Sequence, residues 1–189
     1  MKHELSTRMT RELLAGSLKK LMQKKPLSKI TITEIVKDCG VNRHTFYYHF
    51  DDIYALVEWM FDQEAVELLR KSDNCLSWDE GVLLFLEYIK DNEHICRCAL
   101  DSLGREHLQR FFYNDVVRIS GKIVGELSDG LDVDERTKRF ITEFYTSAIV
   151  ETAIRWIRQG MRETPREIIR LLDITMRGNI KAALERAAV

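Results

Sequence analysis

Apolar residues recur every three or four positions along nearly the whole chain, and a strict alternation of apolar and polar residues is rare. This spacing puts apolar side chains on one face of an α-helix. The first such run ends at the segment Lys24-Lys25-Pro26, because proline cannot continue a helix. The pattern therefore predicts an all-α fold, whose first amphipathic helix carries Met9, Leu13, Leu14, Leu18, Leu21 and Met22.

Two short helices are predicted next. Thr31 and Glu34 have the spacing of a capping box, in which each side chain bonds the backbone N–H of the other residue. The helix that they open should end at Gly40, because glycine readily takes the left-handed conformation of a helix terminus. Asn42 can cap a third helix that runs to about His49. Two short helices with a glycine turn between them predict a helix-turn-helix.

Longer helices follow, and we expect about nine in all. Asp51 or Asp52 should cap the fourth, and the Ser77–Glu80 and Thr164–Glu167 segments both have capping-box spacing. The helix near 134–159 is apolar nearly all round, so it must be buried on more than one side. One side can face the core of the monomer and the other a second subunit. The alternative is a central helix of a monomer.

Composition and charge narrow the class of protein. No apolar run is long enough to cross a bilayer, so we expect a cytoplasmic protein with no membrane partner. The four cysteines lack zinc-ligand spacing and should be free thiols, with no metal and no cofactor. Residues 1–50 contain ten Lys and Arg against four Asp and Glu, whereas residues 51–189 contain 19 against 26. A basic end on an acidic body favours a polyanionic partner at that end.

The helix-turn-helix at residues 31–50 carries the strongest functional signal. The second helix of such a unit enters the DNA major groove with its N-terminal residues nearest the base edges, here Arg43, His44 and Thr45. The polar groups of Tyr47, Tyr48 and His49 could bind phosphates. Alternatively, residues 47–50 could form a buried aromatic cluster. Four consecutive helical residues cover every face, however, so some of them must be exposed.

Residues 31–56 resemble the signature of TetR/AcrR transcriptional regulators. The matching residues are Ile32-Thr33, Val36, Gly40-Val41, Thr45-Phe46-Tyr47-Tyr48-His49-Phe50 and Leu56. The resemblance implies a transcriptional regulator, in most cases a repressor, that binds a double-stranded DNA operator as a homodimer. Where the family often has a lysine near the DNA backbone, this chain has Ile53. The candidate DNA-binding residues are Thr33, Arg43, His44, Thr45, Tyr47, Tyr48 and His49.

The C-terminal part resembles, more loosely, the subgroup that includes dihydroxyacetone-kinase regulators. The shared residues include Tyr88-Ile89, Gly104 and the Pro165–Ile168 segment. The family organisation implies a DNA-binding domain at 7–67 and a helical ligand-sensing and dimerisation domain at 68–189. A small, partly apolar effector would bind there, or the interior would be solid and a coactivator protein would bind instead. The candidate pocket walls are Trp59, Phe85, Tyr88, Phe111 and Tyr145.

Two other classes of function compete with a DNA-binding regulator. An enzyme is not expected, because the chain lacks a glycine-rich phosphate loop and a nucleophile elbow. His44 and His49 are also five residues apart, outside the spacing of a helical metal pair. A helical adaptor that binds only protein is favoured by the loss of the lysine at Ile53. The basic helix from Arg43 to His49 argues against it.

Overall fold

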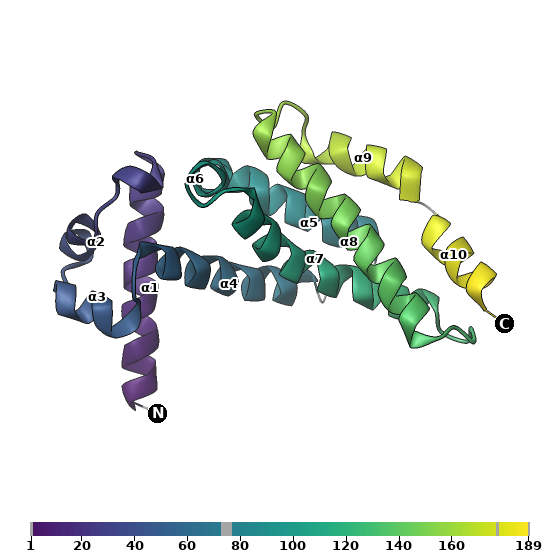
Figure 1. Ribbon diagram of the computed structural model, residues 1–189, viewed down its shortest axis with the longest axis horizontal. Helices are drawn as coiled ribbons and strands as arrows, with labels where there is room; N and C mark the ends of the chain where they lie inside the picture. The colour runs from purple at the N-terminus through teal and green to yellow at the C-terminus, as the bar shows by residue number, and fades with distance from the viewer. Residues whose placement is uncertain (1, 73–76, 177, 189) are drawn as a thin grey trace. The chain divides into compact units, whose positions relative to one another are not determined.

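The computed structural model describes residues 2–72, 77–176 and 178–188, and side chains from residue 7 onward except those of residues 65–76. Every regular element in these ranges is helical, which confirms the all-α prediction (Figure 1). The described residues form ten α-helices and the short 3-10 helix η1 (Leu27–Lys29). None of the described helices is both long enough and apolar enough to cross a bilayer.

The chain packs as two compact units. The first combines Met1–Glu64 with His94–Leu108, and the second combines Ala65–Glu93 with Gln109–Val189. Unit 1 holds α1 (Lys2–Met22), η1, α2 (Ile32–Cys39), α3 (Arg43–His49), the first part of α4 (Ile53–Ser72) and most of α6 (Glu93–Leu103). Unit 2 holds α5 (Trp78–Asp91), most of α7 (Arg105–Leu127), α8 (Glu135–Arg158), α9 (Pro165–Met176) and α10 (Asn179–Ala187).

Local signals set the limits of α2. The Thr31 side chain accepts a hydrogen bond from the Glu34 N–H at 3.3 Å, and Glu34 accepts one from the Thr31 N–H at 3.0 Å. The predicted capping box is therefore confirmed. Gly40 ends the helix with a φ of 72°, in the left-handed region that favours glycine. These contacts bring the chain into α3 after only three residues outside the helices, Gly40, Val41 and Asn42.

One small core holds the helices of unit 1 together. Its centre consists of side chains with no exposed surface from four helices: Leu14, Leu18, Ile35, Phe46 and Leu56. The Ser17 hydroxyl reinforces the contact between α1 and α2 by donating to the Ile35 carbonyl oxygen at 3.0 Å. Met9 and Leu13, which the apolar pattern assigned to the same stripe, are instead exposed. The short α2 and α3 are too small to cover both sides of α1.

Unit 2 is built around the long α8. Asp134 caps this helix by accepting from the Thr137 N–H at 3.0 Å. The buried side of α8 includes Ile149, Ile154 and Trp156. Near its N-terminal end a second cluster joins α7, α8 and α10 through Val124, Val133, Ile141, Ile180 and Leu184.

Two predictions about helix ends in unit 2 are wrong. Ser77 precedes α5, but its exposed side chain makes no capping hydrogen bond, because solvent can satisfy the hydroxyl. The single last helix that the apolar pattern predicted is two helices, α9 and α10. Gly178, with a φ of 74°, lies between them, and this left-handed conformation cannot occur inside an α-helix. The capping box of Thr164 and Glu167 at the start of α9 is confirmed.

Candidate nucleic-acid interface

The first turn of α3 is fixed by its N-cap. The Asn42 side-chain oxygen accepts from the Thr45 backbone N–H at 2.8 Å and from the Thr45 hydroxyl at 3.1 Å. The Thr45 hydroxyl proton is therefore directed to Asn42 and is not available to a base edge. Thr45 is also only half-exposed, unlike Arg43 and His44 beside it. Of the three predicted base-reading residues, the structure leaves Arg43 and His44 open to a partner.

Three of the predicted DNA-binding residues meet at one guanidinium group. Arg43 Nη1 donates to the Thr33 hydroxyl at 3.5 Å, and Arg43 Nη2 donates to the Tyr47 hydroxyl at 3.3 Å. The guanidinium carbon of Arg43 also lies 5.9 Å from the centroid of the Tyr47 ring. This separation falls within the range of a cation–π contact. Helices α2 and α3 thus share one exposed cluster of donors.

The other predicted residues of α3 lie on neighbouring faces of the helix. His44 and Tyr48 are exposed, and the Tyr48 ring meets the His49 ring edge-on at 5.0 Å. Burial, followed by the nearby charge of Arg11, lowers the pKa of His49. At neutral pH the His49 ring is therefore uncharged, and it could offer a phosphate a hydrogen bond but no full positive charge.

Packing beneath α3 holds this surface in place. Phe46 is completely buried, and Phe50, which ends α3, contacts the ring of Trp59 at 5.9 Å. The Arg11 guanidinium lies 5.7 Å from the Phe50 ring centroid. Trp59, predicted as a pocket wall, thus packs with the aromatic residue at the end of the recognition helix.

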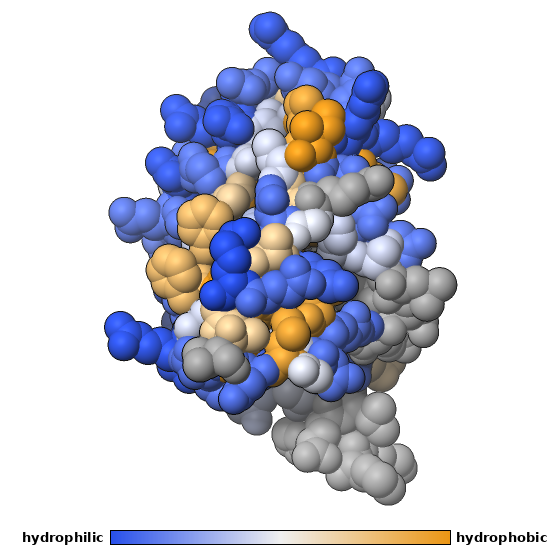
Figure 2. Space-filling view, turned by 90° about the vertical axis from the view of Figure 1, so that its right-hand side faces the viewer, coloured by the Kyte–Doolittle hydropathy of each residue, from blue (hydrophilic) through white to orange (hydrophobic). Residues whose placement is uncertain are grey.

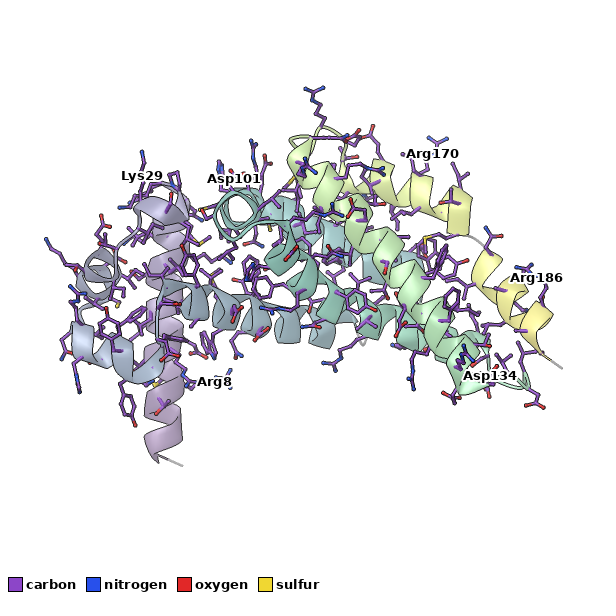
Figure 3. The ribbon with its side chains drawn as sticks, in the orientation of Figure 1. Arg8, Lys29, Asp101, Asp134, Arg170 and Arg186 are labelled. Carbon is purple, nitrogen blue, oxygen red and sulfur yellow. The ribbon has the colours of Figure 1, made fainter. Side chains whose placement is uncertain are left out.

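Three exposed lysines of unit 1 were not among the predicted contacts. Lys24, Lys29 and Lys37 are exposed and form no salt bridge with another described residue, and Figure 3 shows Lys29 pointing outward. By contrast, Lys19, Lys20 and Lys25 are paired with Glu64, Asp38 and Glu34 at 2.7, 2.6 and 2.6 Å. The excess of positive charge in residues 1–50 is the signal that could have indicated the exposed lysines. Long-range attraction to a polyanion would act through these groups.

The first turn of α4 contains Ile53, the position at which the TetR/AcrR signature often has a lysine. Asp52 caps the helix by accepting from the Ala55 N–H at 2.8 Å. Of the two predicted caps, Asp51 and Asp52, the structure uses Asp52. Ile53 is half-buried, and an aliphatic side chain cannot bind a phosphate. The next residue, Tyr54, is exposed and carries a hydroxyl group. No lysine therefore replaces the usual one at the first turn of α4.

The five predicted pocket residues pack with different neighbours. Phe85 contacts the ring of Phe112 at 5.2 Å, whereas the ring of Tyr145 contacts Phe144 at 5.4 Å. Phe111 is buried, and Tyr88 is half-buried. Three open surface cavities formed by described residues are lined by other side chains. A shared pocket for these five residues stays a prediction.

The described cysteines are free thiols, as expected. They are Cys39, Cys96 and Cys98, and Cys75 lies outside the described residues. Burial raises the pKa of all three, that of Cys96 to about 12, so they remain protonated at neutral pH. The described residues form no group of His, Cys, Asp and Glu side chains that could hold a metal ion.

Comparison with solved structures places the fold among known regulators. The chain is similar to the dihydroxyacetone kinase operon activator DhaS, with a TM-score of 0.72 and 21% identity over 95% of this chain and 98% of that one. A TetR transcriptional regulator from Streptococcus agalactiae 2603V has a TM-score of 0.61 and 19% identity over 100% of this chain and 99% of that one. A TetR-family regulator from Pectobacterium atrosepticum has a TM-score of 0.66 and 16% identity over 92% of this chain and 95% of that one.

Sequence comparison agrees with the fold. The HTH-type dhaKLM operon transcriptional activator DhaS of Lactococcus lactis subsp. lactis (strain IL1403) is 29% identical over 84 residues, which are 44% of this chain. The aligned part spans 45% of that relative's length. Residues 17–60 match the family model of bacterial regulatory proteins of the tetR family, and residues 77–178, more than half of the chain, match that of a transcriptional regulator C-terminal region. The chain therefore belongs to the TetR family of DNA-binding transcriptional regulators, which are not enzymes.

Proposed function

We propose that this TetR-family protein acts in the cytoplasm as a dimeric, sequence-specific repressor, whose affinity for a double-stranded DNA operator changes when an effector binds its C-terminal part. The exposed cluster of Arg43, Thr33 and Tyr47 carries the proposal. An arginine at the N-terminus of a recognition helix suits a bidentate hydrogen bond to guanine in the major groove. The proposed division of the chain is a DNA-binding domain at 7–67 and a sensing and dimerisation domain at 68–189.

Exposed aromatic residues on α8 support the dimer. Phe140 and Phe144 are 67% and 60% exposed, and their rings stack with centroids 6.4 Å apart. Leu171 and Ile174 are exposed on α9, whose opposite face packs against its own unit through buried Ile168 and Leu172. Large exposed apolar side chains that lie together, as the rings of Phe140 and Phe144 do, mark protein interfaces. Figure 2 shows hydrophobic side chains among charged ones on the face that is turned towards the viewer.

A second copy is the occupant that fits this surface best. A two-fold dimer would bring α8 and α9 of each subunit together, and its two recognition helices would match two half-sites on DNA. Charged side chains on α9 and α10 point into solvent, as Figure 3 shows for Arg170 and Arg186. They would surround the apolar contact with a polar rim, as in other protein interfaces.

Unit 2 also contains a polar group that an effector could use. Ser120 on α7 is 5% exposed, and its hydroxyl has no hydrogen-bond partner among the described residues. A buried hydroxyl without a partner costs free energy, which a ligand or an internal water could recover. An effector changes operator affinity tenfold if it prefers one conformational state by about 1.4 kcal/mol. We propose a small, partly apolar molecule with a hydrogen-bonding group.

Activation is the second candidate function, favoured by the similarity to DhaS, which is named as an activator. In that case the body would recruit a coactivator protein, and its interior would be solid. A reporter gene placed behind the operator, once that operator has been identified by selection from random duplex DNA, separates repression from activation. Expression should rise on deletion of the regulator if it represses and fall if it activates.

A thermal-shift screen of small molecules, with and without operator DNA, tests the effector. A true effector raises the melting temperature of the free protein and lowers operator affinity. Ser120→Ala should lower the affinity for that ligand more than it lowers the affinity for DNA. If no small molecule changes operator affinity, the effector proposal is wrong, whereas the DNA-binding proposal stands.

A further inference from the structure

We infer that Tyr47 and Thr33 are positioning residues for Arg43 and so determine how sharply the protein distinguishes one base pair from another. This inference rests on the proposed DNA-binding function. It assigns Tyr47 a different role from the phosphate contact that the sequence predicts. The distinction is between holding another side chain and binding the DNA backbone directly.

Geometry places both hydroxyl groups around a single guanidinium. Arg43 and Tyr47 are four residues apart, so they lie on the same face of α3. The Tyr47 hydroxyl accepts from Arg43 Nη2 at 3.3 Å, and the Thr33 hydroxyl accepts from Nη1 at 3.5 Å. The two nitrogens that would face a guanine are thus held by groups from two different helices.

The Tyr47 ring adds a second restraint to its hydroxyl. The guanidinium carbon is 5.9 Å from the ring centroid, and the ring itself packs edge-on against buried Phe46 at 5.6 Å. The position of Tyr47 is therefore tied to the core of unit 1. A long exposed arginine would otherwise sample many rotamers, and ordering it on DNA would cost entropy.

Pre-ordering Arg43 affects recognition in a specific way. A bidentate contact with guanine requires the guanidinium plane to align with the base edge. Restraint of that plane favours the matching base over the others, whereas a phosphate contact favours every sequence equally. Positioning therefore predicts a loss of discrimination, and a phosphate contact predicts a uniform loss of affinity.

Tyr47→Phe and Thr33→Val remove one hydroxyl each and preserve side-chain shape. Affinities would be measured for the selected operator and for duplexes changed at each base pair, with Arg43→Ala identifying the pair that Arg43 reads. Tyr47→Phe should reduce discrimination at that pair by about two- to tenfold, the range of one hydrogen bond, and Thr33→Val should act in the same direction. The matched control is Tyr48→Phe, because Tyr48 contacts His49, and it should change all duplexes by one factor.

The double variant Arg43→Ala/Tyr47→Phe separates the two roles. If Tyr47 acts through Arg43, its substitution has no further effect once Arg43 is gone. A uniform loss that persists in the Arg43→Ala background would overturn the inference, and so would Arg43→Ala leaving base preference unchanged. Failure of the unsubstituted protein to prefer any sequence would instead refute the proposed function. Unchanged circular dichroism and melting temperature would show that each variant is folded.

Discussion

The Asn42 side-chain oxygen holds the first turn of α3 by accepting both the backbone N–H and the hydroxyl of Thr45, at 2.8 and 3.1 Å. Asp134 and Thr137 make the same pair of contacts at the start of α8, at 3.0 and 2.7 Å. One cap supports the candidate DNA-binding surface and the other lies in unit 2. Removing each cap in turn therefore separates an effect on stability from an effect on DNA binding.

Asn42→Ala should destabilise the protein by about 1 kcal/mol, because it leaves the Thr45 N–H in the first turn of α3 without its partner. It should also weaken operator binding, since Arg43 and His44 lie in that turn. Asp134→Ala should cost a similar free energy of unfolding in urea denaturation and leave operator affinity nearly unchanged. Equal losses of DNA affinity in the two variants would contradict a specific role for the α3 cap.

Phe144→Glu should convert the dimer to a monomer, because it puts a charge into the proposed apolar interface. Phe144 is already 60% exposed in one subunit, so the fold itself should tolerate the change. Met9→Glu is the control, since Met9 is 61% exposed but belongs to unit 1. Light scattering at micromolar concentration should give a dimer for the unsubstituted protein and for Met9→Glu. A monomeric unsubstituted protein would refute the dimer.

Glu34 should make stability depend on acidity. Hydrogen bonds lower the pKa of its carboxyl group from 4.5 to about 2. The bond from Lys25 has the largest effect, and the bonds from Thr31 add to it. Because the pKa is lower in the folded state, this stabilisation is complete above about pH 4.5 and is lost as the pH falls towards 2. An NMR titration of the Glu34 carboxyl carbon should give a midpoint near 2.

Glu34→Gln should therefore reduce the loss of stability between these two pH values. Glu167→Gln is a matched control, because Glu167 forms the same capping box with Thr164, and its lowered pKa owes nothing to a lysine. We expect the smaller change from Glu167→Gln. A Glu34 midpoint close to its ordinary value of 4.5 would show that the contact with Lys25 does not form in solution.

Local chemistry allowed much of the fold to be predicted. The capping box of Thr31 and Glu34, the glycine terminus at Gly40 and the cap at Asn42 each depend on residues close in sequence, and all are confirmed. The break at Gly178 was missed because the apolar spacing continues across it from α9 into α10. Periodicity records which face is apolar but does not record a change of backbone direction.

The candidate interface was predictable only in part. The four-residue spacing of Arg43 and Tyr47 is visible in the sequence, whereas Thr33 joins them only when α2 packs against α3. The use of the Thr45 hydroxyl in the cap also depends on a side-chain rotamer that residue type does not fix. Similarly, aromatic composition alone could not show that Trp59 packs on Phe50.

Selection from random duplex DNA tests the central claim most directly, that α2 and α3 of a dimer read a specific operator. The unsubstituted protein should enrich a two-fold symmetric sequence whose half-sites are about 34–36 Å apart, or a multiple of that distance. Affinity for the enriched site should exceed that for random DNA by at least about 10³-fold at physiological salt. Equal affinity for all duplexes, or no binding at any salt concentration, would contradict the account.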